Sequence, residues 1–440
     1  MSELSPILIR HARILMPDDS FLLGDVYLEN GRIALVASEI SIDTAGIRVI
    51  NATGLTLLPG VIDPQVHFRE PGLEYKEDFF TATCACAKGG VTSFLEMPNT
   101  TPLTTTQAAL DDKLQRAANK SLVNYGFFIG ATTENLPDLR EANPTCGIKI
   151  FMGSMKGPLL VDDEAALNAI FSQGDRLIAV HAEDRTRIEE RCQQFAGVRD
   201  PAVHTQIQDN EAALIATKRA LRLSKQYRRR LHILHMSTGE EAELLRQDKP
   251  EWVTAEVTPQ HLVLNTSAYA KIGAKAQMNP PLKSERDNEI LWQALRDGVI
   301  DFIATDHAPH TLEEKSRQYP DTPSGMPGVE TSLPVMLTQA MQGRCTVAQV
   351  SRWMSANPAK GYGIPNKGKI VKGYDADLVL VDLNDYQPVL AENLATKCAW
   401  SPFEGWELTG WPQYTIVGGQ VALDRGVFNT SVRGKALTFV

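Results

Sequence analysis

Four apolar segments of the chain each end in a residue that can bind a metal ion or transfer a proton. These residues are His67, His181, His235 and Asp306. Hydrolytic metal sites use imidazole and carboxylate ligands from neighbouring strand ends, so four such residues at equivalent places predict one metal site. A single histidine at a strand end is more often structural, and the prediction therefore depends on the four occurring together.

A fifth candidate is Lys149, which lies inside the apolar run of residues 147–153. A lysine inside an apolar strand is unfavourable unless it is paired or chemically altered. One interpretation is that its side chain reaches solvent at the edge of the sheet. The other is that its amine reacts with CO₂ to give a carbamate that bridges two metal ions, because burial favours the neutral amine.

Strand-like runs alternate with charged, helix-patterned segments between residues 56 and 363, which predicts an α/β fold with parallel strands. The predicted strands are residues 57–67, 92–97, 123–129, 147–152, 177–182, 231–236, 253–257 and 301–306. The predicted helices include residues 106–119, 163–172, 209–225, 238–246 and 286–297. Such units predict a (β/α)8 TIM-type barrel, in which all strand ends meet at one mouth. A doubly wound open sheet is less favoured, because no G-x-G-x-x-G follows any strand.

Both ends of the chain have the pattern of short antiparallel strands. Asn30-Gly31 is typical of a two-residue hairpin turn, and Gly418-Gly419 divides a second hairpin. We therefore predict that residues 1–55 and 364–440 form one composite β-sandwich domain. It would lie beside a metal-dependent barrel of residues 56–363.

Composition makes several classes of partner unfavourable. The net charge is −9 with no basic block, so we expect no nucleic acid and no membrane partner. A small anionic substrate is compatible with this charge if local arginines bind it. No export signal is visible and the six cysteines are sparse, which predicts reduced thiols and a cytoplasmic protein. For Cys84 and Cys86, the alternative to reduced, unliganded thiols is a pair of metal ligands.

Several longer motifs resemble those of the dihydroorotases, a family of the amidohydrolase superfamily. The motifs are His67-Phe68-Arg69-Glu70-Pro71-Gly72, Glu96-Met97-Pro98-Asn99-Thr100, Asn279-Pro280-Pro281-Leu282-Lys283 and Ala304-Thr305-Asp306-His307-Ala308-Pro309-His310. The resemblance covers most of the chain. It implies a cyclic amide hydrolase that interconverts dihydroorotate and N-carbamoyl-L-aspartate in pyrimidine biosynthesis, with one or two zinc ions per chain and a homodimer.

The resemblance also implies roles for individual residues. The implied metal ligands are His67, Lys149 (carboxylated), His181, His235 and Asp306. Asp306 is also the implied general acid and base. The implied substrate contacts are Arg69, Asn99, Asn279 and His310. Because a guanidinium binds a carboxylate bidentately, Arg69 favours a substrate with a ring carboxylate over those of hydantoinases and allantoinases.

The chain departs from the family pattern at Gln65, where a metal-binding histidine is expected. An amide oxygen is a weaker zinc ligand than imidazole. Three interpretations stay open: one tightly bound zinc, two metals with Gln65 or water completing the ligands, or a non-catalytic scaffold partner of another enzyme. A hydantoinase-like or allantoinase-like cyclic amidase is the alternative among enzymes.

The remaining features carry weaker expectations. We expect His11 and His204 at the surface or in loops and His232 against the helices, and for His261 a position behind the site is an alternative. Residues 323–328 are rich in glycine and proline and follow the last barrel motif. This segment is either a rigid turn or a lid that closes over substrate.

Overall fold

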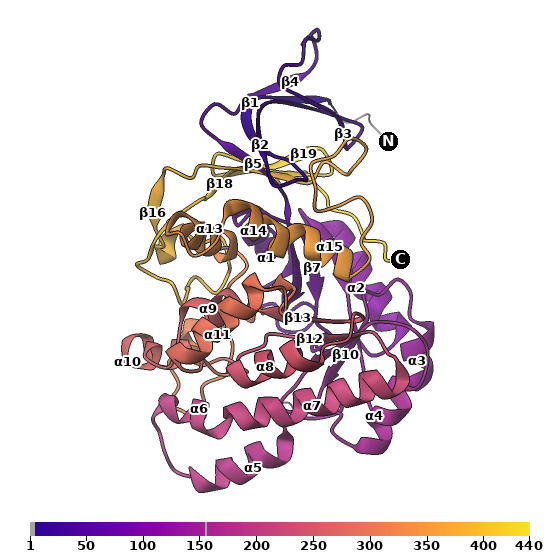
Figure 1. Ribbon diagram of the computed structural model, residues 1–440, viewed down its shortest axis with the longest axis vertical. Coiled ribbons are helices and arrows are strands. Elements are labelled where there is room, and N and C mark those ends of the chain that lie inside the picture. The colour runs from indigo at the N-terminus through magenta and orange to yellow at the C-terminus, as the bar shows by residue number, and fades with distance from the viewer. Residues whose placement is uncertain (1–4, 155) are drawn as a thin grey trace.

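The computed structural model describes residues 5–154 and 156–440, and its centre is a closed barrel of parallel strands (Figure 1). The barrel strands are β6 (Val61–Val66), β7 (Val91–Glu96), β8 (Asn124–Phe127) continued by β9 (Ile129–Gly130), β10 (Ile148–Phe151), β11 (Ile178–His181), β12 (Leu231–Ile233), β13 (Val253–Val257) and β14 (Phe302–Ile303). Neighbouring strands pair in this order, and a parallel bridge between Val66 and His307 closes the ring. The predicted (β/α)8 barrel is confirmed.

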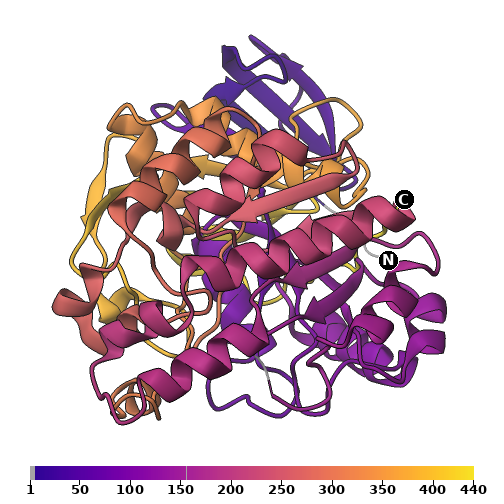
Figure 2. The same ribbon diagram turned by 60° about the horizontal axis from the view of Figure 1, so that its bottom comes forward.

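Helices surround the outside of the barrel (Figure 2). Those between or after the strands are α1 (Phe79–Lys88), α2 (Gln107–Lys120), α3 (Leu136–Glu141), α4 (Glu164–Phe171), α7 (Asn210–Tyr227), α8 (Gly239–Asp248), α11 (Glu285–Arg296), α13 (Ser332–Met341), α14 (Val347–Ser351) and α15 (Asn357–Gly361). The remaining α-helices are α5 (Arg185–Gln194), α6 (His204–Ile207), α9 (Pro259–Val263), α10 (Ala268–Ile272) and α12 (Leu312–Lys315).

The five helices predicted from the sequence begin and end within two residues of their expected positions. Each begins after a side chain that accepts a hydrogen bond from the first turn: Thr106, Asp163, Asp209, Thr238 and Ser284. These N-caps satisfy backbone N–H groups that a helix start otherwise leaves unpaired. Local capping chemistry therefore accounts for the helix positions.

Two barrel strands end earlier than predicted. β12 stops at Ile233 and β14 at Ile303, whereas the apolar patterns continue to residues 236 and 306. Beyond each end the backbone enters the left-handed region, with φ of 37° at His235 and 48° at Asp306. Arg69 has φ of 68°. This region is unfavourable for side chains other than glycine, and such residues cluster at functional sites.

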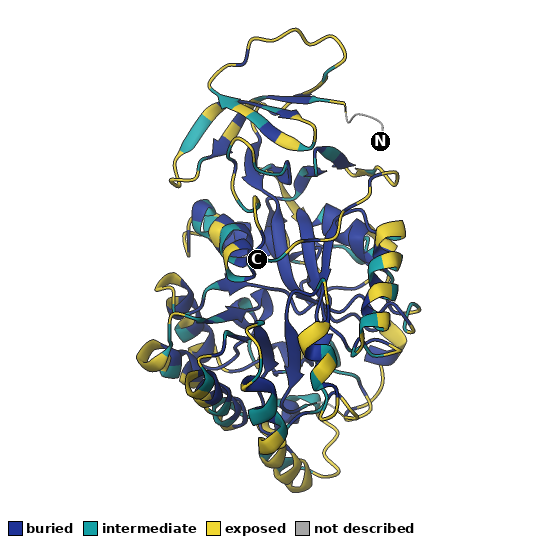
Figure 3. Cartoon of the chain, turned by 90° about the vertical axis from the view of Figure 1, so that its right-hand side faces the viewer, coloured by how far each residue is buried: buried dark blue, intermediate teal, exposed yellow. Residues whose placement is uncertain are grey.

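Both ends of the chain join in one nine-stranded sheet beside the barrel (Figures 1 and 3). Its strands are β1 (Ile7–Leu15), β2 (Phe21–Glu29), β3 (Arg32–Ala37), β4 (Arg48–Asn51), β5 (Thr56–Pro59), β15 (Leu378–Val381), β18 (Pro412–Val417), β19 (Gln420–Asp424) and β20 (Val427–Phe428). β5 lies between β1 and β15, so the N-terminal and C-terminal strands share it. The sheet encloses an apolar core of its own, as a sandwich requires.

The rest of the chain after the barrel adds a two-stranded ribbon, β16 (Tyr386–Pro388) with β17 (Glu407–Thr409). All six cysteines are free, and only Cys192 is exposed. Burial raises the pKa of the Cys84 thiol to about 11, which disfavours the thiolate that a metal pair with Cys86 needs. None of the described helices combines the length and the apolar character needed to cross a membrane.

A buried ion pair fixes the ends of the first two barrel strands. Lys113 Nζ lies 2.6 Å from Glu96 Oε2. Glu96 Oε1 accepts a 3.1 Å hydrogen bond from the backbone N–H of Phe68. The pair therefore links helix α2 and strand β7 to the segment that carries His67 and Arg69.

Replacing Lys113 with methionine should destabilise the protein by about 3–5 kcal/mol at pH 8, because Glu96 is left as an uncompensated buried charge. Burial raises the pKa of Glu96 from 4.5 to about 7 even with the lysine present. The protonated form of Glu96 is thus favoured in the folded state. The stabilisation of the fold that comes from this proton is fully present below about pH 4.5, and it is lost as the pH rises through 7. Losing the lysine raises this pKa further, so the variant should lose less stability at pH 5 than at pH 8. Denaturant unfolding at both pH values measures this difference.

The double variant Lys113→Met with Glu96→Gln serves as the control. It should recover part of the lost stability, because the unpaired charge is gone. An equal loss at both pH values, with no recovery in the double variant, would contradict the ion-pair explanation.

Candidate active site

All nine predicted site residues line one cavity of about 230 Å³ at the carboxyl ends of the barrel strands. They are His67, Arg69, Asn99, Lys149, His181, His235, Asn279, Asp306 and His310. Gln65, Phe151, Ser154, Ala308, Ser324 and Gly325 complete the lining. The barrel therefore brings together side chains that lie up to 243 positions apart in the sequence, from His67 to His310.

Asp306 is the acceptor at the centre of the cavity. Its Oδ1 lies 3.1 Å from Gln65 Nε2 and 3.1 Å from His67 Nε2. The other ring nitrogen of His67, Nδ1, lies 2.6 Å from Asn99 Oδ1. Burial lowers the pKa of His67, so the ring is neutral at pH 7 and has one proton for two oxygen neighbours. One of the two contacts thus needs a proton or a cation from elsewhere.

His181 and His235 face each other on adjacent strand ends. His181 Nδ1 lies 2.9 Å from His235 Nε2. On its far side, His181 Nε2 donates to Glu183 Oε2 at 2.7 Å, which leaves Nδ1 as the lone pair that faces the cavity. A carboxylate behind a metal-binding imidazole fixes its tautomer and orientation in this way.

Lys149 is fully buried, and its Nζ has no hydrogen-bond partner in the described structure. Burial lowers its pKa to about 7, so a large fraction of the amine is neutral at neutral pH. The interpretation that it reaches solvent at the sheet edge is wrong. The neutral amine is the form that reacts with CO₂, and the resulting carbamate would supply two oxygen ligands.

These groups fit a metal ion only if Lys149 is carboxylated. Among residues 5–154 and 156–440, no three His, Cys, Asp or Glu side chains gather as a metal-binding group. His181 and His235 supply two facing nitrogens, and an unmodified lysine cannot supply the third ligand. The donor set therefore fits a metal once Lys149 is carboxylated, and Asp306 and His67 line the same cavity. Gln65, whose Oε1 has no partner among the described residues, would be a weaker ligand there than a histidine.

Arg69 is buried, and its guanidinium forms no ion pair with a carboxylate of the described residues. Its Nε donates to the carbonyl oxygen of Pro309 at 3.1 Å, and its Nη2 lies 3.3 Å from His310 Nε2. The alternative of a surface ion pair with Glu70 or Asp78 does not hold, because Glu70 pairs with Arg116 and Lys120 and Asp78 with Lys397. The guanidinium is left as a buried cation at the edge of the cavity.

One histidine differs from its predicted setting. His204 is buried rather than exposed, and its Nε2 lies 2.8 Å from Asn279 Oδ1. His232 contacts Glu256 at 2.9 Å, stacks on Phe302 and meets the ring of Tyr362, the C-cap residue of α15, edge to face. It does not line the cavity, whereas His235 does. His261 does lie behind the site, with Nε2 bonded to the carbonyl oxygen of Pro280 at 3.0 Å.

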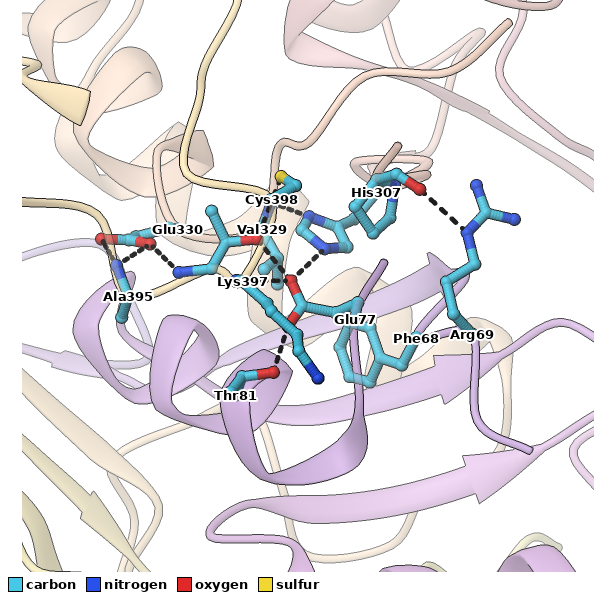
Figure 4. Close-up of polar contacts among 12 residues, drawn as sticks. Phe68, Arg69, Glu77, Thr81, His307, Val329, Glu330, Ala395, Lys397 and Cys398 are labelled. Carbon is cyan, nitrogen blue, oxygen red and sulfur yellow. Dashed lines mark hydrogen bonds and ion pairs between the residues drawn. The ribbon is translucent and has the colours of Figure 1, made fainter. Parts of the chain in front are cut away.

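A segment from the C-terminal part of the chain is held against the back of the site. Figure 4 shows the Glu77 carboxylate next to His307, Lys397 and Thr81, with Glu330 beside Ala395. Glu77 accepts from the backbone N–H of Lys397 at 3.1 Å, and Glu330 accepts from that of Ala395 at 2.8 Å. Neither glutamate was predicted to matter, since no local pattern announces a partner more than 60 residues away in the sequence.

Residues 323–328 are packed against the mouth of the cavity. The backbone N–H of Gly325 donates to Gln277 at 3.0 Å, and Met326 accepts from Ala308 at 2.9 Å. Lys315 Nζ donates to the carbonyl oxygens of Pro323 at 2.9 Å and Gly325 at 3.2 Å. In this structure the segment forms part of the cavity wall.

Fold and site together define a barrel hydrolase with a buried polar cavity at the strand ends. The amidohydrolase family model matches residues 56–422, and the chain belongs to this family. Its sequence is 36% identical over 429 residues to a dihydroorotase of Methanosarcina acetivorans, covering 94% of this chain and 91% of the relative. A dihydroorotase of Halobacterium salinarum is 36% identical over 404 residues, covering 91% and 93%.

Solved structures give the same fold. The L-hydantoinase of Arthrobacter aurescens superposes with a TM-score of 0.93 at 31% identity, covering 98% of this chain and 99% of that one. The dihydropyrimidinase of Brevibacillus agri has a TM-score of 0.91 at 27% identity, covering 99% of each. The chain is a dihydroorotase-like cyclic amidohydrolase, and the curated dihydroorotases make the hydantoinase-like interpretation the weaker one.

Proposed function

We propose that this chain interconverts dihydroorotate and N-carbamoyl-L-aspartate in pyrimidine biosynthesis, in the cytoplasm and with zinc as its metal. The observation that carries the proposal is Arg69, a buried guanidinium that lines the cavity and has no carboxylate partner among residues 5–154 and 156–440. Dihydroorotate has a ring carboxylate that a guanidinium binds bidentately, whereas hydantoin and allantoin have none on the ring. Arg69 thus favours the carboxylated ring over its uncharged analogues.

The substrate contacts follow from the hydrogen-bond donors that remain available at the cavity. Asn99 Oδ1 is occupied by His67, and its amide N–H₂ group has no acceptor among the described residues, in a cavity that Arg69 also lines. Asn279 is held by His204, and its side chain faces the same cavity. These donors would bind the carboxylate and ring of the substrate and orient the amide towards Asp306.

Asp306 would move the proton. In ring opening, its carboxylate accepts the proton of the attacking water and delivers it to the departing ring nitrogen; ring closure runs the same transfers backwards. Its Oδ1 already lies within hydrogen-bond distance of two side chains, so the carboxylate is fixed before substrate binds. His181, His235 and a carboxylated Lys149 would hold the zinc. Bound zinc supplies Lewis acidity, which polarises a carbonyl and lowers the pKa of water to about 7.

Assays of the purified chain with four compounds test the proposal: dihydroorotate, N-carbamoyl-L-aspartate, hydantoin and allantoin. We expect turnover of the first two in zinc-loaded protein. Turnover of hydantoin or allantoin instead would replace the proposal with the hydantoinase-like alternative. If metal-loaded protein turns over none of the four, the scaffold interpretation is favoured.

Metal removal should abolish activity reversibly. Treatment with a chelator is expected to reduce turnover to background, and zinc with bicarbonate should restore it, because the carbamate on Lys149 needs both. Restoration by zinc in CO₂-free buffer, with no mass increase on Lys149, would contradict a role for the carbamate.

The number of zinc ions bound per chain should rise when Gln65 is replaced by histidine. Gln65 Nε2 donates to Asp306, and its Oε1 has no partner in the described structure. We expect about one zinc per chain in the native protein, because the amide is a weak ligand, and a value closer to two in Gln65→His. Elemental analysis of both proteins at saturating zinc measures this difference. Two zinc ions in the native chain, or no gain in the variant, would contradict it.

A further inference from the structure

His310, at the edge of the cavity, is held by hydrogen-bonding groups at both ring nitrogens. Its Nδ1 lies 3.0 Å from Lys76 Nζ. Its Nε2 lies 3.0 Å from the carbonyl oxygen of Ser324 and 3.3 Å from Arg69 Nη2. The backbone carbonyl of His310 also accepts from Trp400 Nε1 at 2.7 Å, which fixes the residue from behind.

Lys76 determines which nitrogen of His310 carries the proton. An ammonium group only donates hydrogen bonds, so Nδ1 must present its lone pair to Lys76. Burial, together with the charges of Arg69 and Lys76, lowers the pKa of His310 well below its usual value, so the ring is neutral. A neutral ring with an unprotonated Nδ1 carries its proton on Nε2, where the Ser324 carbonyl oxygen at 3.0 Å can accept it. Arg69 Nη2, 3.3 Å from Nε2, also only donates, so in this tautomer the two groups are neighbouring donors and not a hydrogen-bonded pair. The Nε2 proton points to Ser324 and the cavity side.

Without Lys76 a different tautomer would be favoured. Glu314 Oε2 lies 3.6 Å from His310 Nδ1, close enough to attract a proton to that nitrogen. Lys76 Nζ pairs with Glu314 Oε1 at 3.0 Å. The ammonium group therefore supplies the positive charge that Glu314 would otherwise draw from a proton on Nδ1. If Nδ1 carried the proton, Nε2 would turn a lone pair towards the cavity and repel an anionic group there.

We propose that Lys76 is a positioning residue that holds His310 in the Nε2–H tautomer, so that His310 and Arg69 both donate to the anionic group of the substrate. Lys76 does not itself line the cavity, and it acts through His310. The role in substrate binding rests on the proposed function above, whereas the tautomer does not depend on it.

The tautomer is tested by NMR on protein with 15N-labelled histidine. The His310 signals, identified by their loss in His310→Asn, should show a protonated Nε2 and an unprotonated Nδ1. Lys76→Met should move the proton to Nδ1, and Lys76→Arg, which keeps a side chain that only donates, should not. If the methionine variant does not fold, Lys76→Gln replaces it, because an amide oxygen can accept from Nδ1–H. Tyr75→Phe is the matched control: it removes another hydrogen bond to Glu314, at 3.1 Å, without touching His310.

Kinetics test the consequence for substrate. Lys76→Met should raise KM for dihydroorotate by about 10–100-fold, the effect of losing a hydrogen bond to a charged group, with kcat within about twofold. In the His310→Asn background the same change should have little further effect, because Lys76 acts through His310. An unchanged tautomer in Lys76→Met overturns the proposal, and so does a full KM effect in the His310→Asn background. If the native chain does not turn over dihydroorotate, the proposed function fails, and the NMR result still decides the tautomer.

Discussion

Replacing Asp306 with asparagine should reduce kcat for dihydroorotate hydrolysis by about 10²–10⁴-fold, the range that a positioned acid–base group contributes. In the native protein Gln65 Nε2 lies 3.1 Å from Asp306 Oδ1. An asparagine has the same shape and can offer Gln65 an acceptor oxygen, but its amide cannot accept the proton of water. KM should change little, because the substrate carboxylate is bound by other residues. Initial rates in both reaction directions measure the effect, since one group serves both.

Two controls separate chemistry from structure in the Asp306→Asn variant. Its unfolding midpoint should match that of the native protein, and its zinc content should be measured, because Asp306 is also a candidate ligand. A variant that retains both its zinc and more than a tenth of native kcat would exclude Asp306 as the proton carrier.

Replacing Arg69 with methionine should lower kcat/KM for dihydroorotate by about 10²–10³-fold, because two charge-assisted hydrogen bonds to the carboxylate are lost. Most of the change should fall on KM. Arg69→Lys should recover little, because a single ammonium group cannot reproduce the planar fork. The structural reason is that, among the described residues, the guanidinium has no carboxylate partner: its Nε donates to the Pro309 carbonyl at 3.1 Å, and the neutral His310 ring lies 3.3 Å from its Nη2.

A matched arginine elsewhere provides the control for Arg69→Met. Arg116 pairs with Asp112 and Glu70 outside the cavity, and Arg116→Met should leave KM unchanged. Any residual hydrolysis of uncharged dihydrouracil should also be insensitive to the Arg69 change. Equal losses with charged and uncharged substrates would show that Arg69 supports the fold rather than recognises the carboxylate.

The barrel was predictable because the local sequence signals for strands and for helix starts agree with the alternation of strands and helices along the chain. Apolar runs gave the strands, and capping residues such as Thr106 and Ser284 gave the helix starts. The strand ends were less predictable. At His235 and Asp306 the chain leaves the strand in a left-handed conformation that the apolar pattern does not reveal. Tertiary contacts at the site override the local preference there.

The site residues that sequence reasoning found share one property: each lies in or at the end of a predicted strand, or belongs to a recognisable motif. Lys76 and His204 have no such signal, because their roles depend on contacts made across the barrel mouth. His204 meets Asn279 only because α6 folds against the turn at residues 279–280. Glu183 lies only two positions after His181 in the sequence, and the usual pairing of a carboxylate with a metal-binding imidazole could have identified it.

The shared strand β5 also sets the order in which the molecule can be completed as it is synthesised. β5 pairs with β1 on one side and with β15 on the other, yet β15 begins only at Leu378. At translation rates of about 5–20 residues per second, the chain between Pro59 and Leu378 takes roughly 15–60 s to emerge from the ribosome. Throughout that interval the edge of β5 lacks its partner, and an unpaired strand edge is a template for aggregation. The small sheet is therefore the last part of the molecule to close, although its first strands are made before any part of the barrel.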